Sequence, residues 1–463
     1  MEPNNSPWLY RLNRTRPVNT VQSNMTSDVV IVGGGISGLV SAYYILKNTE
    51  HSLILIEATK VAHGATGHNA GQLVGEFERP FTDLVREYGL EKAIDAENNM
   101  TRAWILLDEM IADAKLATPI STFLGYNGYK YAPSIIDQIK ANSLRRQAGE
   151  PTHQIYVAKE SPVLKLIPHE FAGLYDVVPQ SNILDLLETE DESYVAASVI
   201  RKGCANSARL TEELVGYLLA TYPKRFQLFE HSPVKSLDLH DKSARVSIKD
   251  EPYHIDTKHV LLCTNGFEWI DIKNHAGANI DKSFHEMVNG DIGYMAAYTE
   301  ELGMPPTALG YYDQSGVDRE VVGDAYHEPP YFYKTRRPYE LEKNQTHSLI
   351  CIGGPEEQIE ETRNYDRYAP FLKEKGELID DFVHKTIAHH REKKMEYKFE
   401  WHGIMCYTPT NMRVVGFEPK NPILLYNLGC NGVGIIPSIY GSFKISKLLS
   451  GETFAPRIFD PRG

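Results

Sequence analysis

The sequence predicts an α/β protein whose first structural unit is a strand, a helix and a second, parallel strand. Residues 28–32 form a short β-branched apolar run, which suits a strand buried on both faces. A glycine-rich turn at 33–38 follows directly, and apolar residues at helical spacing continue from 39 to 46. A second apolar run, 53–56, ends at Glu57. This order of strand, glycine turn, helix, strand and acid is typical of a Rossmann-like dinucleotide-binding unit.

Each part of this unit has a physical role in holding a dinucleotide. Gly33 permits the tight turn, Gly35 lets the backbone approach a pyrophosphate, and Gly38 allows the helix to pack closely on the strand. The N-terminus of the helix offers N–H groups and a partial positive charge to the phosphates. Glu57 lies 19 residues after Gly38, near the roughly 20 expected for an acid that binds ribose hydroxyls, and an acid there disfavours NADP. The alternative is an ordinary tight turn between a strand and a helix.

Composition and charge narrow the function classes. The 463 residues are 42% hydrophobic and 24% charged, which fits two or three globular domains or one enzyme with an inserted domain. A net charge of −13 disfavours nucleic acid as the main partner, because phosphate binding needs a basic face. No apolar stretch approaches the roughly 18 residues that span a bilayer, and residues 1–27 lack the apolar middle of a secretory signal. We therefore expect a soluble, cytoplasmic protein.

The remaining segments predict further helices and strands. The patterns of 79–115, 210–222, 364–400 and 438–449 indicate helices, whereas 118–133, 231–266, 290–354 and 423–428 are strand-like. Five cysteines without a C-x-x-C pair argue against a zinc ribbon or a disulfide framework, and we assign no metal site.

The loop after Glu57 indicates which dinucleotide binds. Residues 61–72 read Val-Ala-His-Gly-Ala-Thr-Gly-His-Asn-Ala-Gly-Gln. This loop resembles the G-A-S/T-G-x-N-x-G loop of the glycine oxidase, sarcosine oxidase and D-amino acid oxidase superfamily, where the loop lies beside a flavin ring. Later motifs of this superfamily have counterparts here in the same order along the chain. Val234 is similar to the residue whose backbone contacts the adenine in that superfamily, and residues 264–266 resemble its A-x-G turn. Residues 401–403, 407–409, Gly416 and 429–434 are similar to the C-terminal signature of that superfamily.

The resemblance implies FAD as the cofactor and a glutathione reductase-type FAD-binding domain. We expect the FAD domain to be discontinuous, with residues 28–86, 196–270 and 400–463. A second, α+β substrate domain on a mixed or antiparallel sheet is expected from 87–195 and 271–399. Residues 1–27 form an N-terminal extension, which is either a loose tail or anchored by residues such as Trp8. The expected FAD-binding residues are Gly33, Gly35, Ile36, Ser37, Gly38, Glu57, Ala58, Ala65, Thr66, His68, Asn69, Gly71, Gln72, Leu73, Val234, Thr264, Gly266, Gly432, Val433, Gly434 and Ile435.

Three departures from the superfamily pattern bear on the electron acceptor. Where relatives carry T-P-D-x-x-P, this chain has Thr-Pro-Thr-Asn-Met-Arg at 408–413. Val433 stands where relatives often have histidine, and Ile436 stands where monomeric sarcosine oxidases place a lysine that helps oxygen react. The resemblance therefore leaves open whether oxygen or another acceptor, such as a partner protein, takes the electrons. It also leaves open whether the chain forms a homo-oligomer.

His68 offers two alternatives. It resembles a histidine that links covalently to the flavin in the dimethylglycine dehydrogenase branch, and the other alternative is a histidine that hydrogen-bonds within the loop. A cysteine link is less favoured, because Met405 occupies the position of that cysteine and Cys406 faces the opposite side of the strand.

The resemblance implies oxidation of a C–N bond in an amine or amino acid to an imine, by hydride transfer to FAD. Such a reaction needs positioning and charge complementarity more than side-chain chemistry. For an amino acid carboxylate we expect Lys334 as the cation, then Arg336, then Arg413; the alternative is a solvated basic stretch at 334–337. Tyr333 and Tyr407 are candidates for the pocket wall. His402 is either a polar neighbour of the flavin or a buried structural residue.

Two other functions remain open at this point. One is an FAD-dependent 2-hydroxy acid dehydrogenase, and the other is a flavin-binding electron-relay subunit without a substrate of its own.

Overall fold

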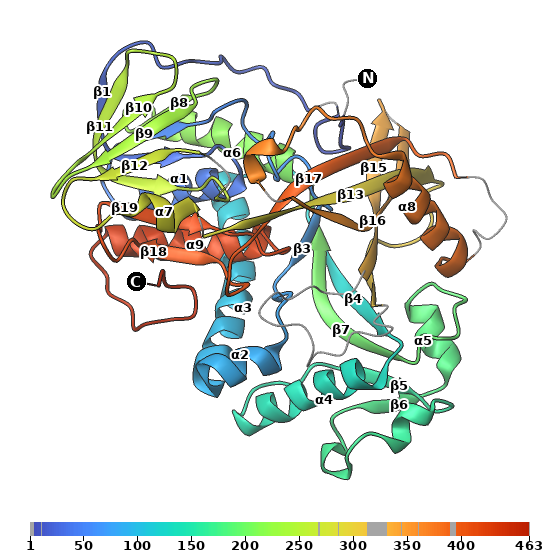
Figure 1. Ribbon diagram of the computed structural model, residues 1–463. Coiled ribbons are helices and arrows are strands. Elements are labelled where there is room, and N and C mark those ends of the chain that lie inside the picture. Colours follow the sequence, from blue (N-terminus) through green and yellow to red (C-terminus); the bar gives the residue numbers. More distant parts are fainter. Residues whose placement is uncertain are drawn as a thin grey trace.

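The computed structural model describes residues 4–10, 12–266, 269–285, 287–312, 331–343, 345–359, 361–388 and 395–462. Two large sheets with helices packed on them form the molecule, as Figure 1 shows. This architecture confirms the predicted fold class, an α/β cofactor-binding part joined to a second part on a mixed sheet.

The first sheet contains the predicted strand–helix–strand unit. β1 (Met25–Val32) and β2 (Leu53–Ile56) are parallel neighbours, and α1 (Ile36–Asn48) connects them. β8 (Phe226–Phe229) extends the parallel set beyond β2, and β11 (His254–Leu262) followed by β19 (Leu424–Leu428) extends it on the other side of β1. A meander of β9 (Val234–Leu239) and β10 (Ala244–Ile248), with β12 (Asp271–Asn274), completes the sheet together with β18 (Val414–Phe417), which pairs with β19.

The apolar run in β1 is explained by burial on both faces of this sheet. Val29 and Ile31 face a core shared with α1, α3 (Leu90–Ala114), α6 (Ser207–Thr221) and α9 (Ile435–Leu449). Val30 and Val32 face a second core that includes residues of β9, β10 and β12. Successive side chains of a strand point to opposite faces, so a strand covered on both sides is apolar throughout.

The second sheet is mixed. Its order is β17 (Phe399–Tyr407), β13 (Asn289–Glu300), β16 (Gln345–Ile359), β15 (Tyr331–Glu342), β14 (Thr307–Tyr312), β4 (Ser121–Tyr129), β7 (Ala196–Cys204), β5 (Ile155–Ala158) and β6 (Asp176–Val178). β14–β4 and β5–β6 are parallel pairs and the other neighbours are antiparallel, while the short β3 (Gln72–Val74) pairs with β7. β7 and β17 belong to this sheet although their residues fall in the expected FAD domain, so the domain boundaries stay a prediction.

The remaining helices differ in extent from the sequence expectation. The helix expected over 79–115 is two helices, α2 (Phe81–Tyr88) and α3, and the one expected over 364–400 is the shorter α8 (Lys373–Thr386). Pro370 disfavours helical geometry at the residue before it, which argues against one continuous helix from 364. α4 (Ala132–Gln147) and α5 (Gln180–Leu186) lie near β5 and β6, and α7 (Asp281–His285) is a short turn near β12 (Figure 1). Within the described ranges, no helix combines the length and the apolar character needed to cross a bilayer.

The described part of the N-terminal extension packs onto the glycine-rich loop. Trp8 is buried, its indole N–H donates to the carbonyl of Asn69 at 2.5 Å, and its ring meets that of Trp401 edge-on. The Arg337 guanidinium lies 4.6 Å from the centre of the Trp8 ring. The extension is therefore anchored at this point and supports the loop from outside.

Candidate functional site

A cavity of about 450 Å³ lies where the carboxyl ends of β1, β2 and β11 meet strands of the second sheet. Ligands of open α/β sheets bind at this edge. The sequence-predicted cofactor residues that line the cavity are Gly33, Gly35, Ile36, Ser37, Glu57, Ala58, Ala65, Thr66, His68, Asn69, Gln72, Val234, Thr264, Gly432, Val433, Gly434 and Ile435. Segments separated by up to four hundred residues therefore converge on one space.

The turn between β1 and α1 can be made only by glycine at its first position. Gly33 has φ of 111°, and a Cβ placed on it would lie 2.6 Å from the carbonyl oxygen of Cys263. The following helix begins at Ile36 without an acidic residue in its first turn, and no side chain of its N-cap residue, Gly35, closes that end. The N-terminus of α1 thus presents its partial positive charge to the cavity.

Glu57 stands at the end of β2 and organises the turn from the other side. Its carboxylate accepts hydrogen bonds from the backbone N–H of Gly34 and of Thr59, each at 2.8 Å. Because a carboxylate has about four acceptor positions, Glu57 can accept further hydrogen bonds from ribose hydroxyls while it holds the turn.

The loop that follows is held by its own asparagine. The Asn69 amide donates to the carbonyl of Thr66 at 2.7 Å and accepts from the N–H of Gly71 at 2.6 Å. The Thr66 hydroxyl in turn accepts from the N–H of Ile36 at 2.9 Å, which ties the loop to the first residue of α1. The loop is therefore a shaped wall of the cavity.

His68 lines the cavity with both ring nitrogens near backbone carbonyls. Nδ1 lies 3.1 Å from the oxygen of Gly64, and Nε2 lies 3.2 Å from the oxygen of Asn4. Burial lowers the pKa of His68, so the ring is neutral and donates one hydrogen bond. A covalent bond at either nitrogen would remove that donor, because a neutral imidazole has a single N–H.

Four predicted cofactor residues do not line the cavity and have packing roles. A Cβ on Gly38 would lie 2.0 Å from the carbonyl oxygen of Gly33, so Gly38 allows α1 to approach the turn. Gly71 packs against Trp8, Leu73 is fully buried, and Gly266 packs against Val288.

Tyr333 of β15 is the predicted pocket residue that the structure places in the cavity wall. It lies across Gly353 of the neighbouring strand: a Cβ at Gly353 would be 2.4 Å from Cζ of Tyr333. Burial raises the pKa of Tyr333 far above its usual value, so the phenol is neutral and can donate a hydrogen bond.

Lys334, the first cation expected for a substrate carboxylate, does not line the cavity. Its ammonium lies 2.6 Å from Oε2 of Glu188, and the same carboxylate accepts two hydrogen bonds from Arg336 at 2.7 and 2.6 Å. Lys334 follows Tyr333 directly, and neighbouring residues of a strand point to opposite faces. The placement argues against a substrate contact for Lys334 and for Arg336, and assigns both to an ion-pair cluster in the interior.

Arg413 lines the cavity at the N-terminus of α1 rather than among the tyrosines. Its Nη2 donates to the Ser37 hydroxyl and to the Asn427 carbonyl, both at 2.9 Å, and its Nε donates to the Asn427 side chain at 2.6 Å. None of these acceptors carries a charge. Burial lowers the pKa of Arg413 to about 10, which still leaves the guanidinium positive at neutral pH.

The two remaining candidates lie beside the cavity. The Tyr407 hydroxyl donates to Oε2 of Glu78 at 3.1 Å, and Glu78 lines the cavity. The ring of His402 is enclosed, with Nδ1 3.1 Å from the Tyr365 hydroxyl and Nε2 3.0 Å from the carbonyl of Ala369. Tyr407 thus contacts the cavity only indirectly, by its hydrogen bond to Glu78. His402 has the surroundings expected of a buried structural residue.

Several cavity residues were not among the predicted ones. The chemically notable additions are Glu78, Glu356, Tyr331, Arg367, Met405 and Cys430. Glu78 lies only six positions after Gln72, so its closeness to the predicted flavin loop in the sequence could have indicated that it lines the same cavity. Glu356 enters from β16, and its position depends on strand register that the sequence does not reveal.

The donor and acceptor groups in the cavity fit FAD. Glu57 would accept from the adenosine ribose, the α1 N-terminus and the Arg413 guanidinium would face the diphosphate, and the loop that contains residues 64–72 would flank the flavin. A buried guanidinium whose hydrogen-bond acceptors are all neutral is stabilised by an anion, because an uncompensated charge is costly to bury. A diphosphate supplies that anion.

Comparison with known proteins agrees with this fit. A family model described as FAD dependent oxidoreductase (DAO) matches residues 28–442. Gamma-glutamylputrescine oxidoreductase of Escherichia coli (strain K12) is 34% identical over 92 residues, which are 20% of this chain and 21% of that protein. The probable oxidoreductase OrdL of Haemophilus influenzae is 24% identical over 270 residues, 58% of this chain and 53% of that protein. The aligned parts thus span about a fifth and about half of these two relatives.

A solved structure has the same fold. Glycine oxidase from Geobacillus kaustophilus superimposes with a TM-score of 0.64 at 15% sequence identity, over 94% of this chain and 98% of that chain. The match of the family model to nearly the whole chain, together with the cavity that fits FAD, shows that this protein belongs to the FAD-dependent oxidoreductase (DAO) family.

Proposed function

We propose that this FAD-dependent oxidoreductase oxidises the C–N bond of an amine to an imine, which water then hydrolyses. FAD supplies the hydride acceptor for such a reaction. The observation that carries the proposal is the charge of the cavity wall away from α1. Glu78 and Glu356 line it together with Tyr331 and Tyr333, whereas Lys334 pairs with Glu188. Arg367 also lines the cavity, but its guanidinium donates to the Thr59 hydroxyl at 3.1 Å, beside Glu57. A cationic amine complements such a wall better than a substrate carboxylate does.

The side chains of this wall can orient an amine and receive its proton. An ammonium must lose a proton before its neighbouring C–H bond can be broken as hydride, and a carboxylate within hydrogen-bond reach can accept that proton. Glu78 already accepts a hydrogen bond from Tyr407 at 3.1 Å, which fixes its orientation. Tyr333 can donate a hydrogen bond to a lone pair of the neutral amine. The strands of the second sheet hold these groups in place, so the contribution of the protein is mainly positioning.

The comparisons support an amine as the substrate class. One relative is named for γ-glutamylputrescine, a compound with a primary amine. The two alternatives are less well supported by the cavity. A 2-hydroxy acid would bring its carboxylate toward the carboxylates of Glu78 and Glu356. A subunit that only relays electrons would not need a cavity wall, formed by the second sheet, that carries acids and tyrosines.

The nitrogen balance of the reaction tests this proposal. Oxidation of a primary amine under anaerobic conditions should release one ammonia for each flavin reduced, together with an aldehyde or ketone that a hydrazine reagent can trap. Flavin reduction by a substrate without ammonia or amine release would contradict C–N oxidation and favour the hydroxy acid.

A further inference from the structure

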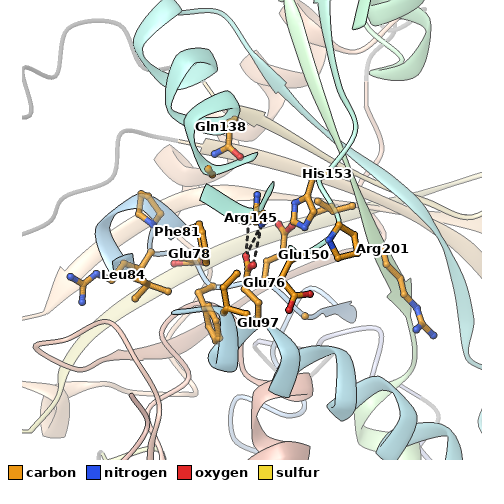
Figure 2. Close-up of a pocket in the computed structure, with 18 of the residues that line it drawn as sticks. Glu76, Glu78, Phe81, Leu84, Glu97, Gln138, Arg145, Glu150, His153 and Arg201 are labelled. Carbon is orange, nitrogen blue, oxygen red and sulfur yellow. Dashed lines mark hydrogen bonds and ion pairs between the residues drawn. The ribbon is translucent and has the colours of Figure 1, made fainter. Parts of the chain in front are cut away.

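The structure contains a second cavity of about 500 Å³, whose lining residues are drawn in Figure 2. Its wall comes from residues 75–84, from α3 and α4, and from β4 and β7. Glu78 lines both cavities, so the two spaces are neighbours that share this side chain as part of their walls. Nothing in the proposed reaction at the flavin requires a space of this size, which is comparable to a small-molecule site.

A row of stacked tyrosines connects the two cavities. Tyr129 and Tyr312 line the second cavity and stack with ring centres 5.2 Å apart. Tyr312 stacks on Tyr331 at 4.9 Å, and Tyr331 lies 5.4 Å from Tyr333 in the first cavity. Stacked rings cover one another's faces, so the row offers mainly apolar ring edges, which favour an alkyl chain. The row therefore suits the uncharged alkyl part of a long ligand.

Glu76 is one of the carboxylates that line this second cavity (Figure 2). Its side chain is 34% exposed, and its Oε1 lies 3.5 Å from Nδ1 of His153. Burial and Arg145 lower the pKa of His153 to about 4, so His153 is neutral and brings no positive charge. Burial raises the pKa of Glu76, whereas the positive charges of Arg145 and Lys202 act in the opposite direction.

The nearby cations are engaged with other groups. Arg145 binds Glu97 through two nitrogens, at 2.6 and 3.0 Å, as Figure 2 shows. Lys202 donates to the side-chain oxygen of Asn127 at 2.8 Å. Both cations favour the ionised form of Glu76 through their charge, but the described residues show no ion pair between Glu76 and either of them. A ligand ammonium would add that direct contact.

We infer that the second cavity binds the distal end of the substrate and that Glu76 pairs with a second ammonium there. This inference rests on the proposed oxidation of an amine in the first cavity. The substrate class is then an elongated diamine, with the reacting nitrogen near Tyr333 and Glu78, the alkyl chain along the tyrosine row, and the distal ammonium at Glu76.

Anaerobic flavin reduction by amines of matched length tests the inference. The probes are hexylamine, 1,6-diaminohexane and 6-aminohexanoate, and the measured quantity is the concentration that gives half of the maximal reduction rate. We expect the diamine to half-saturate at a concentration at least about tenfold lower than hexylamine, as one charge-assisted hydrogen bond would give. The carboxylate-tailed probe should require a concentration higher than hexylamine does.

Variants of Glu76 complete the test. Glu76→Gln should bring the half-saturating concentration of the diamine close to that of hexylamine, and Glu76→Asp should retain part of the difference. Glu91→Gln removes the same charge from the exposed face of α3 and should behave as the unsubstituted protein. Equal half-saturation by diamine and monoamine in the unsubstituted protein, or a preference that survives in Glu76→Gln, would overturn the inference while leaving amine oxidation intact. Reduction by none of the amines would refute the proposed function and the distal subsite with it.

Discussion

The Arg413 guanidinium donates a hydrogen bond to the hydroxyl of Ser37 at 2.9 Å. Ser37 belongs to the first turn of α1, so a side chain from near the C-terminus adds a full positive charge to the positive end of that helix. The chain as a whole carries a net charge of −13, so it offers no general positive surface to a diphosphate. The local positive charge of Arg413 is therefore important for binding such an anion. We assign Arg413 to the diphosphate of FAD rather than to a substrate carboxylate.

Replacing Arg413 should weaken FAD binding. Arg413→Gln removes the buried charge but keeps hydrogen-bonding capacity, so we expect the dissociation constant of FAD to rise by about tenfold to a hundredfold, the size of one or two charge-assisted hydrogen bonds. Titration of the apoprotein with FAD, followed by quenching of flavin fluorescence, measures this constant. Arg209→Gln on the exposed surface of α6 is the matched control. An unchanged FAD affinity in Arg413→Gln would contradict the assignment.

The flavin should be released when the protein is denatured in acid. The His68 ring contacts two backbone carbonyls and has a single N–H to offer them, which favours the noncovalent alternative. Precipitation with trichloroacetic acid followed by absorbance of the supernatant at the flavin band checks this. Yellow colour that stays in the pellet, and that His68→Ala moves to the supernatant, would establish the covalent link instead.

Loss of the Lys334 ammonium should change stability and leave amine binding unaltered. Lys334→Met breaks one contact of a buried ion-pair cluster, so we expect the free energy of unfolding to fall by about 1–3 kcal/mol, since Arg336 still compensates Glu188. Chemical denaturation measures the loss, and the half-saturating concentration for amines measured in parallel should not shift. A weaker affinity for carboxylate substrates alone, with unchanged stability, would restore Lys334 to the substrate site.

The same cluster predicts a pH dependence of stability. Burial alone would raise the pKa of Glu188, but the hydrogen bond from Arg336 and the charge of Lys334 lower it to about 2. A lowered carboxyl pKa gives stability that is fully present above the unfolded value of about 4.3 and is lost as the pH falls toward 2. The stability difference between the unsubstituted protein and Glu188→Gln should therefore shrink between pH 5 and pH 3, as measured by urea unfolding. A difference that is constant over this range would disprove the linkage.

The sequence predicted the cofactor half of the site far better than the substrate half. The turn after β1 depends on local sequence: Gly33 must adopt a positive φ, and Glu57 must end the neighbouring strand. Such local requirements can be recognised in a single sequence. Tyr333 and Lys334 could not both face one cavity, because they are adjacent on a strand; sequence alone did not say which of the two would. The second cavity depends on how α3 and α4 pack near β7, and no short motif encodes that arrangement.

The positions of the carboxylates were the hardest part to predict. Glu78 packs so closely on Gly432 that a Cβ there would lie 1.7 Å from its Oε1. These residues are more than three hundred positions apart, and the contact exists only in the folded chain. An acid near a glycine-rich loop is ordinarily a solvated residue, so its role at the junction of two cavities follows from tertiary structure.

Anaerobic mixing of the FAD-loaded protein with a primary amine, with absorbance recorded at the oxidised flavin band, tests amine oxidation most directly. The charge of the cavity wall predicts that amines bleach the flavin and that 2-hydroxy acids at the same concentration do not. Bleaching by 2-hydroxy acids in the absence of any response to amines would contradict the proposed function.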